Sequence, residues 1–391
     1  MRKQRIATIA AKNRIIDNII QAMISRDNFV LMGHKNPDED CIASMVAFGL
    51  LLSKFHKSVS LLICSDIHHH FQYMLNICKY NSIGMLEDCR ELPAGTESLV
   101  IFDTPKPSLL ENYPASAALL SSPDLLRIEI DHHLEADSAY IGDPGYCLVD
   151  EASSASELVG YIGFKLQDRP ALLEEHQIGE LFSRNLVLAI LTGIVGDSKM
   201  GKYLKTSREK WFYRSFSTMF NSMLASKTYK SSRNFSTMQE LFGELEKLSE
   251  KEDLCFRYLI ERKDTRSKLI YAVVLKEQDT TAMTAEYDQD TIITVARYTA
   301  DRLAEESGCL SLVVYYDDPA VSRWIQFRMR RSERFKTLDL RTVLKRFAIT
   351  NGGGHPGAIG FRLDRDKIAD IDAYSRELVS GTEALIREAG V

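Results

Sequence analysis

The sequence lacks the features that mark several classes of protein. Its seven cysteines are odd in number, lie far apart and form no C-x-x-C pair, which excludes a disulfide framework and a cysteine-based zinc site. Its longest apolar stretches, such as LVLAILTGIVG, are too short and too interrupted to cross a bilayer. Neither sign of charge dominates, because 49 basic residues stand against 54 acidic ones and the formal net charge is -5, so duplex DNA is not an expected partner. We expect a soluble protein with no membrane partner and with reduced thiols, as in the cytoplasm.

Regular patterns divide the chain into four segments. The basic amino end, residues 1–27, has the Ile and Ala spacing of an amphipathic helix and no continuous apolar run of a secretory signal. Over residues 28–197, β-rich runs such as NFVLMGH and SLVIFDT alternate with helical patterns, which predicts a parallel sheet. Residues 198–267 are polar and partly helical, as in a linker, and residues 268–391 return to an α/β pattern. The predicted fold class is α/β, with an N-terminal parallel-sheet domain, a helical linker and a smaller C-terminal α/β domain.

Acidic and imidazole side chains follow apolar runs at four places. They are His34, Asp38 and Asp40 in GHKNPDED; Asp103 in FDT; Asp131, His132 and His133 in IDHH; and Asp197 in GIVGD. Three of these groups come directly after a predicted strand, and the fourth ends a predicted helix. Because the carboxyl ends of parallel strands meet at one edge of a sheet, we expect the groups to converge. Carboxylates brought so close together would repel one another unless a cation compensated their charge.

The number and type of these side chains predict a site for two metal ions. Two histidines and four aspartates offer six ligands, more than one octahedral ion would take while keeping positions open for a substrate. Carboxylates and imidazoles without thiolates favour Mn²⁺, Mg²⁺, Fe²⁺ or Zn²⁺. Two ions about 3.5 to 4 Å apart can promote displacement at phosphorus. Taken singly, Asp40 would be interpreted as a helix N-cap, and Asp103 and Asp197 as caps or turn residues.

The four motifs, in this order, resemble those of the DHH phosphoesterase family. That family includes the RecJ exonucleases, the family II inorganic pyrophosphatases, exopolyphosphatases and the NrnA-type nanoRNases. The stretch NGGGHPGAIGF, residues 351–361, resembles the GGGH signature of the DHH-associated substrate-binding domain that accompanies RecJ and NrnA-type members. The chain departs from NrnA-like proteins in its extra N-terminal helix, in its long linker, and at Ile359, where the second Ala of the signature is usual.

The resemblance implies a role for each matching residue. The ligands implied for one Mn²⁺ are His34, Asp38 and Asp103. Those implied for the other are Asp40, Asp103, His132 and Asp197. Asp103 would therefore bridge the two ions. As catalytic residues, His133 would lie beside the phosphate and Asp131 would orient an imidazole by accepting its N–H. The residues implied in substrate binding are Arg328, Gly352, Gly353, Gly354 and His355. Glycines there would let backbone amides approach a phosphate closely.

These roles predict a Mn²⁺-dependent phosphodiesterase that degrades short oligonucleotides to mononucleotides, with Mg²⁺, Fe²⁺ or Co²⁺ as alternative metals. Dephosphorylation of 3',5'-bisphosphate nucleotides is a second expected activity. The motifs leave other functions open: a cyclic or linear dinucleotide phosphodiesterase, an exopolyphosphatase, a RecJ-like single-strand exonuclease, or a nucleotide sensor that has lost catalysis. Whether the chain forms a homodimer also stays open.

Overall fold

The computed structural model divides the chain into two compact units, residues 1–247 and 248–391, which are described separately. It describes residues 2–64, 67, 71–86, 92–111, 115–134, 137–198, 200–201, 203–227, 240–241, 243, 247–265, 267–320 and 322–388. No helix in these ranges is long and apolar enough to span a membrane.

The first unit is built on a six-stranded parallel sheet, as the sequence predicts. The strands are β1 (Phe29–Met32), β2 (Val59–Leu62), β3 (Gly84–Leu86), β4 (Ser98–Phe102), β5 (Leu126–Asp131) and β6 (Cys147–Val149). Their order is β3-β2-β1-β4-β5-β6, and each neighbouring pair is parallel. The chain thus adds strands on one side of β1 and then reverses to the other side. Ligands of such sheets bind at the carboxyl ends of the strands near this reversal, between β1 and β4.

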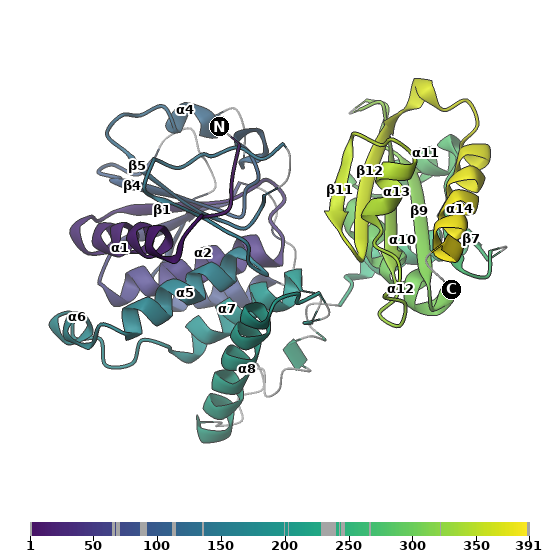
Figure 1. Cartoon of the computed structure of the whole chain (residues 1–391). Helices are drawn as coiled ribbons and strands as arrows, with labels where there is room; N and C mark the ends of the chain where they lie inside the picture. The colour runs from purple at the N-terminus through teal and green to yellow at the C-terminus, as the bar shows by residue number, and fades with distance from the viewer. Residues whose placement is uncertain are drawn as a thin grey trace. The chain divides into compact units, whose positions relative to one another are not determined.

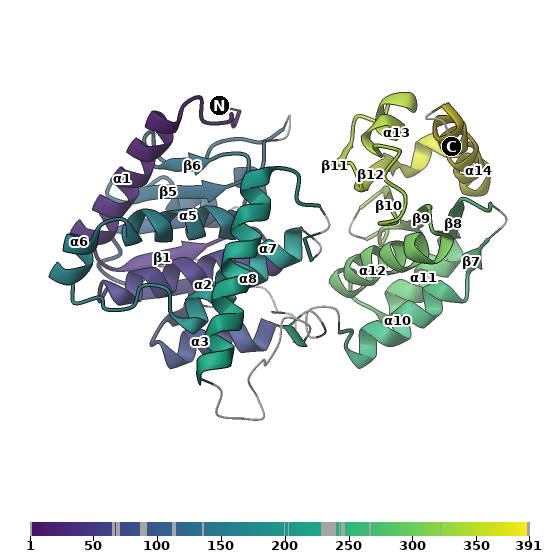
Figure 2. The same ribbon diagram turned by 60° about the horizontal axis from the view of Figure 1, so that its bottom comes forward.

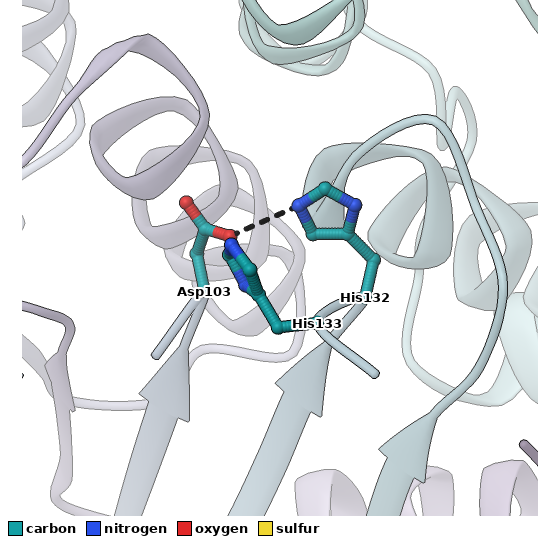
Figure 3. Close-up of side chains that lie close together, drawn as sticks. All are labelled: Asp103, His132 and His133. Atoms are coloured by element: carbon teal, nitrogen blue, oxygen red, sulfur yellow. Dashed lines mark ion pairs between the residues drawn. The ribbon is translucent and has the colours of Figure 1, made fainter. Parts of the chain in front are cut away.

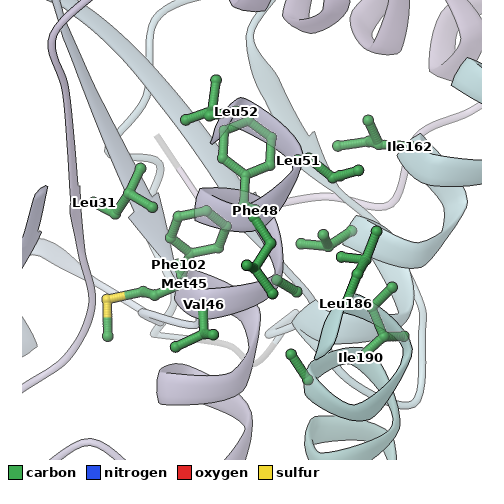
Figure 4. Packing of buried hydrophobic residues seen from close by; sticks show 14 of the residues in the cluster. Leu31, Met45, Val46, Phe48, Leu51, Leu52, Phe102, Ile162, Leu186 and Ile190 are labelled. Carbon is green, nitrogen blue, oxygen red and sulfur yellow. The ribbon is translucent and has the colours of Figure 1, made fainter. Parts of the chain in front are cut away.

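Helices cover the two faces of this sheet unequally (Figure 1). The larger set is α1 (Ile9–Ser25), α2 (Glu39–Lys54), α5 (Ala155–Gln167), α6 (Pro170–Glu175) and α7 (Arg184–Asp197), with α3 (Gln72–Tyr80) and α8 (Ser207–Lys227) beside them. The other face carries the short α4 (Ala115–Leu119) and the 3₁₀ turn Pro107–Leu109. Helix α2 is apolar on all sides because it lies between the sheet and two helices. In Figure 4, Phe48 of α2 lies beside Phe102 of β4, and Leu51 points towards Ile162 of α5.

The segment 198–267, predicted as a linker, is divided between the units where the structure describes it. Helix α8 belongs to the first unit, because Phe212, Phe216 and Phe220 are buried in the core of that unit. The rings of Phe216 and Phe164 lie 5.3 Å apart. The second unit takes α10 (Glu250–Ile260) and a short strand, β7 (Lys263–Asp264). Residues 228–239, within the predicted linker, lie outside the described residues.

The second unit is a six-stranded mixed sheet between two layers of helices (Figure 2). Its strand order is β11-β12-β10-β9-β8-β7, and only β8 and β9 are parallel. The strands are β8 (Ile270–Val274), β9 (Leu310–Tyr316), β10 (Trp324–Arg331), β11 (Gly352–His355) and β12 (Ala358–Asp364), with β7 at one edge. Helices α10, α11 (Glu277–Glu286) and α12 (Gln289–Ser307) pack on one face. Helices α13 (Arg341–Arg346) and α14 (Ile371–Glu388) pack on the other, and the 3₁₀ turn Arg365–Lys367 follows β12.

Candidate metal centre

The residues singled out in the first unit lie where strands end. His34 follows β1, Asp103 follows β4 directly, and His132 and His133 follow β5. Figure 3 shows Asp103 at the end of one strand and both histidines at the end of its neighbour, with the side chains turned towards one another. The remaining groups come from helices: Asp38 is the N-cap of α2, Asp40 is in its first turn, and Asp197 is the last residue of α7.

Two sets of three ligand atoms form the core of the site. One set comprises His34, Asp38 and Asp103, and the other Asp40, His132 and Asp197; within each set the atoms lie within 4.8 Å of one another. A third set, Asp103, His132 and His133, meets the same criterion. The structure therefore brings together all six side chains predicted as metal ligands, and it adds the ring of His133.

Asp103 lies between the two sets. Its Oδ2 atom is 3.7 Å from Nε2 of His34, whereas its Oδ1 atom is 3.3 Å from Nε2 of His132. The residue is 2% exposed and has a φ of 47°, in the left-handed region that non-glycine residues rarely adopt. Such backbone conformations cost free energy and concentrate at functional sites. One carboxylate oxygen thus faces each half of the site, as the predicted bridging role requires.

The orientation of the histidine rings suits metal binding. Nδ1 of His34 donates to the backbone carbonyl of Lys35 at 2.8 Å, and Nδ1 of His132 donates to that of Ala152 at 3.3 Å. A carbonyl oxygen can only accept, so each ring carries its proton on Nδ1 and presents Nε2 to the carboxylates. Second-sphere hydrogen bonds of this kind orient metal-binding imidazoles in proteins.

Two buried atoms in the centre make no hydrogen bond within the part of the chain that the structure describes. They are Oδ1 of Asp103 and Nε2 of His132. A buried polar atom without a partner is costly, and in native proteins it usually indicates an ion or water. Oxygen and nitrogen atoms with no sulfur among them match the preferences of Mn²⁺, Mg²⁺, Fe²⁺ and Zn²⁺. The residues present therefore fit divalent ions.

Protons partly compensate the charges of the centre when no metal is bound. Burial acts to lower the pKa of the His132 imidazole, but the carboxylates of Asp103 and Asp197 raise it well above its usual value. Burial, together with the charges of Asp103 and Asp197, raises the pKa of Asp40 well above its usual value. A divalent ion would have to displace these protons, because metals bind neutral imidazoles and ionised carboxylates.

Asp40 is oriented by the amino end of α5. Its Oδ2 atom accepts from the amide of Ala155 at 2.5 Å, and its Oδ1 atom accepts from that of Ser156 at 2.9 Å. The free N–H groups and the dipole at a helix N-terminus favour a carboxylate there. Asp40 is fully buried, with Oδ2 4.0 Å from Nε2 of His132. The helix thus fixes a carboxylate that also faces the metal site.

Helix α7 reaches the centre because two glycines let it approach α2 and α5 closely. A Cβ atom at Gly193 would lie 2.5 Å from Cβ of Ser156, and closer still to Oγ of Ser156 and Oδ1 of Asp40. A Cβ atom at Gly196 would lie 3.0 Å from Cγ of Glu39. Neither position can hold a larger residue without moving its neighbours. This approach places Oδ2 of Asp197 3.1 Å from Nε2 of His132.

Asp131 and His133, predicted as catalytic, are hydrogen-bonded to each other. Oδ1 of Asp131 accepts from Nδ1 of His133 at 2.8 Å, and it also accepts from the backbone amides of His132 and His133. Burial acts to lower the pKa of His133, but Asp131 outweighs this effect and raises it to about 9. Asp131 itself is fully buried, whereas the His133 side chain is 27% exposed. The accessible edge of His133 can therefore donate a hydrogen bond to an anion at neutral pH.

The residues predicted to bind substrate lie on neighbouring strands of the second unit. Arg328 in β10 is opposite Gly360 in β12, and Gly360 is opposite Gly353 in β11. A Cβ atom at Gly360 would collide with the guanidinium group of Arg328, while a Cβ atom at Gly353 would meet nothing within 4 Å. The arginine therefore lies over one glycine, and open space lies over the next.

The other residues of the GGGH stretch have different surroundings. Gly352 and Gly354 allow close strand pairing, because a Cβ atom would collide with Phe361 or with the backbone of Ala358. Gly354 also has a φ of 137°, which favours glycine. His355 is exposed at the end of β11. Only Gly353 of the three glycines faces open space, so the other two are explained by packing.

Several residues that shape the centre are not evident from the sequence. The amides of Ala155 and Ser156, which hold Asp40, carry no sequence signal, because their role depends on the docking of α5. A glycine inside a helical pattern, as at Gly193, is a recognisable sign of close packing. Lys3, whose ammonium group is buried beside Asp131, gave no signal in the basic amino end.

One family model matches part of the first unit. Residues 28–194 match the family model described as the DHH family, N-terminal domain. This part of the chain is a DHH-family domain. Its acidic and imidazole clusters are able to hold metal, and DHH phosphoesterases are metal-dependent. The chain is accordingly a hydrolase of the metal-dependent phosphoesterase class.

Solved structures also resemble the whole chain. An exopolyphosphatase-related protein from Bacteroides fragilis shares 18% identity and a TM-score of 0.62, over 96% of each chain, which supports the α/β fold of both units. A pGpG-specific phosphodiesterase from Vibrio cholerae matches with 13% identity and a TM-score of 0.36, over 92% of this chain and 99% of that one. CDC45 from Entamoeba histolytica matches with 9% identity and a TM-score of 0.32, over 94% and 96%. No curated protein matches the chain.

Proposed function

We propose that the protein is a Mn²⁺-dependent phosphodiesterase that hydrolyses short oligonucleotides to mononucleotides and also dephosphorylates 3',5'-bisphosphate nucleotides. The observation that carries the proposal is the position of Asp103 between two sets of ligand atoms, with one carboxylate oxygen facing each set. A site with this symmetry suits two ions that share one ligand.

Each of the six predicted ligands would contact at least one ion. His34, Asp38 and Asp103 would hold one ion, and Asp40, Asp103, His132 and Asp197 the other. When bound, the ions would supply an activated water and would neutralise charge on the phosphate. The ligands of Mg²⁺ and Mn²⁺ are similar, and we favour Mn²⁺ because imidazoles supplement the carboxylates.

The residues around the ions would handle the phosphate. His133 would donate a hydrogen bond from its accessible edge to a phosphate oxygen, and Asp131 beside Nδ1 favours the charged form of the ring that this requires. Asp131 would hold the ring at the correct angle by accepting from Nδ1. An imidazolium fixed in this way acts on developing negative charge without having to reorient during the reaction.

The second unit would bind the nucleotide end of the substrate. The Arg328 guanidinium over Gly360 offers a charged donor to a phosphate, and the open surface at Gly353 leaves room for it. His355 is exposed near the same edge and can add a donor. We propose short nucleotides as substrates because binding of long single strands depends on extended basic grooves with stacking aromatics.

The proposal is tested by product analysis with a panel of substrates. The panel contains RNAs of two to ten nucleotides, cyclic and linear dinucleotides, a 3',5'-bisphosphate nucleotide, polyphosphate and bis-p-nitrophenyl phosphate, each assayed with Mn²⁺ and with Mg²⁺. We expect the short RNAs to have the highest kcat/KM. We also expect Asp103→Ala and His132→Ala to lose at least about a thousandfold in kcat, whereas the exposed Asp124→Ala stays near the wild-type value.

Other results would redirect the assignment. Highest kcat/KM on polyphosphate or on a dinucleotide would replace the oligonucleotide by that substrate. Tight nucleotide binding without hydrolysis of any substrate, with either metal, would show a sensor and reject the enzymatic proposal. Loss of activity in Asp124→Ala equal to that in Asp103→Ala would show that the metal centre is wrongly located.

A further inference from the structure

Lys3 is a buried lysine in the amino-terminal arm, residues 2–8, which precedes α1. Only 1% of its surface is exposed. Its Nζ atom is hydrogen-bonded to Oδ2 of Asp131, lies 2.7 Å from Oε1 of Glu129, and donates to the backbone carbonyl of Thr104 at 2.6 Å. The contacts with Asp131 and Thr104 are hydrogen bonds, and the contact with Glu129 is an ion pair.

A buried ammonium group needs partners that compensate its charge. Removing an ammonium group from water costs several kcal/mol unless charges and hydrogen bonds compensate it. Lys3 is compensated by two carboxylates on the same face of β5, since Glu129 and Asp131 are two residues apart in a strand. Removing the lysine would leave the buried Glu129 without its cation and Asp131 with the His133 ring alone.

The partners of Lys3 belong to the segments that build the metal centre. Thr104 directly follows Asp103, so the lysine is bonded to the backbone next to the proposed bridging ligand. Asp131 offers Oδ2 to Lys3 and Oδ1 to the ring and backbone amide of His133. One carboxylate thus connects the arm to the imidazole, and Lys3 joins the ends of β4 and β5.

Other contacts hold the arm against the segments that follow β5 and β6. The backbone N–H of Gln4 donates to the hydroxyl of Tyr140, which donates in turn to the carbonyl of Gln4, both at 3.1 Å. The guanidinium group of Arg5 lies 3.1 Å from the carboxylate of Glu151. In Figure 1 the amino end lies on the face of the sheet opposite α2, α5 and α7. The arm is therefore bound as a defined element, and Lys3 is its buried end.

We propose that Lys3 is a positioning residue for phosphoester hydrolysis, which fixes Asp131 and, through Asp131, the imidazole of His133. The amino-terminal arm is then part of the functional centre. The kinetic test of this inference rests on the proposed function, whereas its spectroscopic test needs no substrate.

The kinetic test is a double-mutant cycle on bis-p-nitrophenyl phosphate at saturating Mn²⁺. Lys3→Met should lower kcat by about 10- to 100-fold, as is usual when a residue behind a catalytic group is removed, with little change in KM. In a His133→Ala background the same substitution should lower kcat by no more than about threefold, because the residue through which Lys3 acts is gone. Equal losses in both backgrounds would overturn the proposal.

The spectroscopic test observes the His133 ring in ¹⁵N-histidine-labelled protein, assigned with His133→Gln. In the wild type, Nδ1 should give a protonated signal protected from water by Asp131. In Lys3→Met this signal should broaden or shift. An unchanged signal in the folded variant would overturn the inference even if the protein proves inactive on every phosphoester, so this failure is distinct from failure of the proposed function.

Lys12→Met is the matched control. Lys12 is also buried, in α1, but it pairs with Asp150 at 2.9 Å, and among the described residues no hydrogen bond or ion pair joins it to a ligand of the metal centre. It should lower the Tm while leaving kcat and the His133 signal near wild type. If Lys3→Met does not fold, Lys3→Met combined with Glu129→Gln removes the carboxylate charge that loses its cation and is tested in the same way. Losses of kcat in Lys12→Met as large as in the Lys3 variant would attribute the effect to stability and reject the positioning role.

Discussion

Gly193→Ala is expected to destabilise the protein and weaken its metal binding, although alanine is the better helix former. Gly193 lies inside α7, where replacing glycine by alanine in an open position would gain about 1 kcal/mol. Here the new Cβ atom would lie 2.5 Å from Cβ of Ser156. Carbon atoms make favourable contact only at about 3.5 Å or more, so α7 and α5 would have to separate by about 1 Å. Rotation of the Ser156 hydroxyl cannot relieve this contact, because Cβ is fixed to the backbone.

Two opposing free energies decide whether Gly193→Ala stabilises or destabilises the protein. Overpacking of a buried contact costs about 1 to 3 kcal/mol, which cancels or exceeds the gain in helix propensity of about 1 kcal/mol. The displacement also affects Asp40, because its Oδ1 atom is among the nearest neighbours of the new methyl group. We expect a net loss of about 1 kcal/mol in the free energy of unfolding of the metal-free protein. We also expect Mn²⁺ affinity to fall by about tenfold or more, because a ligand is misplaced.

Chemical denaturation and titration calorimetry with Mn²⁺ measure the two quantities. Gly179→Ala is the matched control, because a Cβ atom there would meet nothing within 4 Å, and it should change the free energy of unfolding by less than about 0.5 kcal/mol. A Gly193→Ala protein that is stabilised by about 1 kcal/mol and binds Mn²⁺ as tightly as the wild type would refute the reasoning, since it would show that α7 does not depend on a glycine there.

Two further results are expected. Burial acts to lower the pKa of both metal-site imidazoles, His34 and His132, but Cys41, Asp103 and Asp38 raise the pKa of His34 well above its usual value. Asp103 and Asp197 do the same for the pKa of His132, so metal uptake should release protons. Calorimetry in buffers of different ionisation enthalpy should detect this release, and apparent Mn²⁺ affinity should rise by about tenfold per pH unit for each proton displaced; affinity independent of pH would contradict it. In the second unit, Arg328→Ala should raise KM for a dinucleotide by about tenfold or more while leaving KM for bis-p-nitrophenyl phosphate unchanged, with the exposed Arg341→Ala as control. Equal changes on both substrates would remove the assigned role of Arg328.

The fold class and the location of the candidate centre follow from local patterns in the sequence. Apolar runs predict β1, β4 and β5, and the positions of His34, Asp103 and His132 directly after those runs predict that they meet at one sheet edge. The α/β prediction is confirmed, with a parallel sheet in the first unit and a mixed sheet in the second. These features are readable because the hydrophobic period of a strand or helix is set by neighbouring residues.

The pairing of buried charged groups depended on contacts between segments far apart in the chain. Lys3 meets Asp131 across 128 positions, and Ala155 holds Asp40 across 115, so no local pattern could indicate either pair. The division of residues 198–267 between the units followed from which aromatic side chains α8 could bury. Local periodicity thus determined the elements and the side chains at their ends. Only the tertiary structure decided which charges are buried together, because the cost of burying a charge is compensated by partners that the fold alone brings within reach.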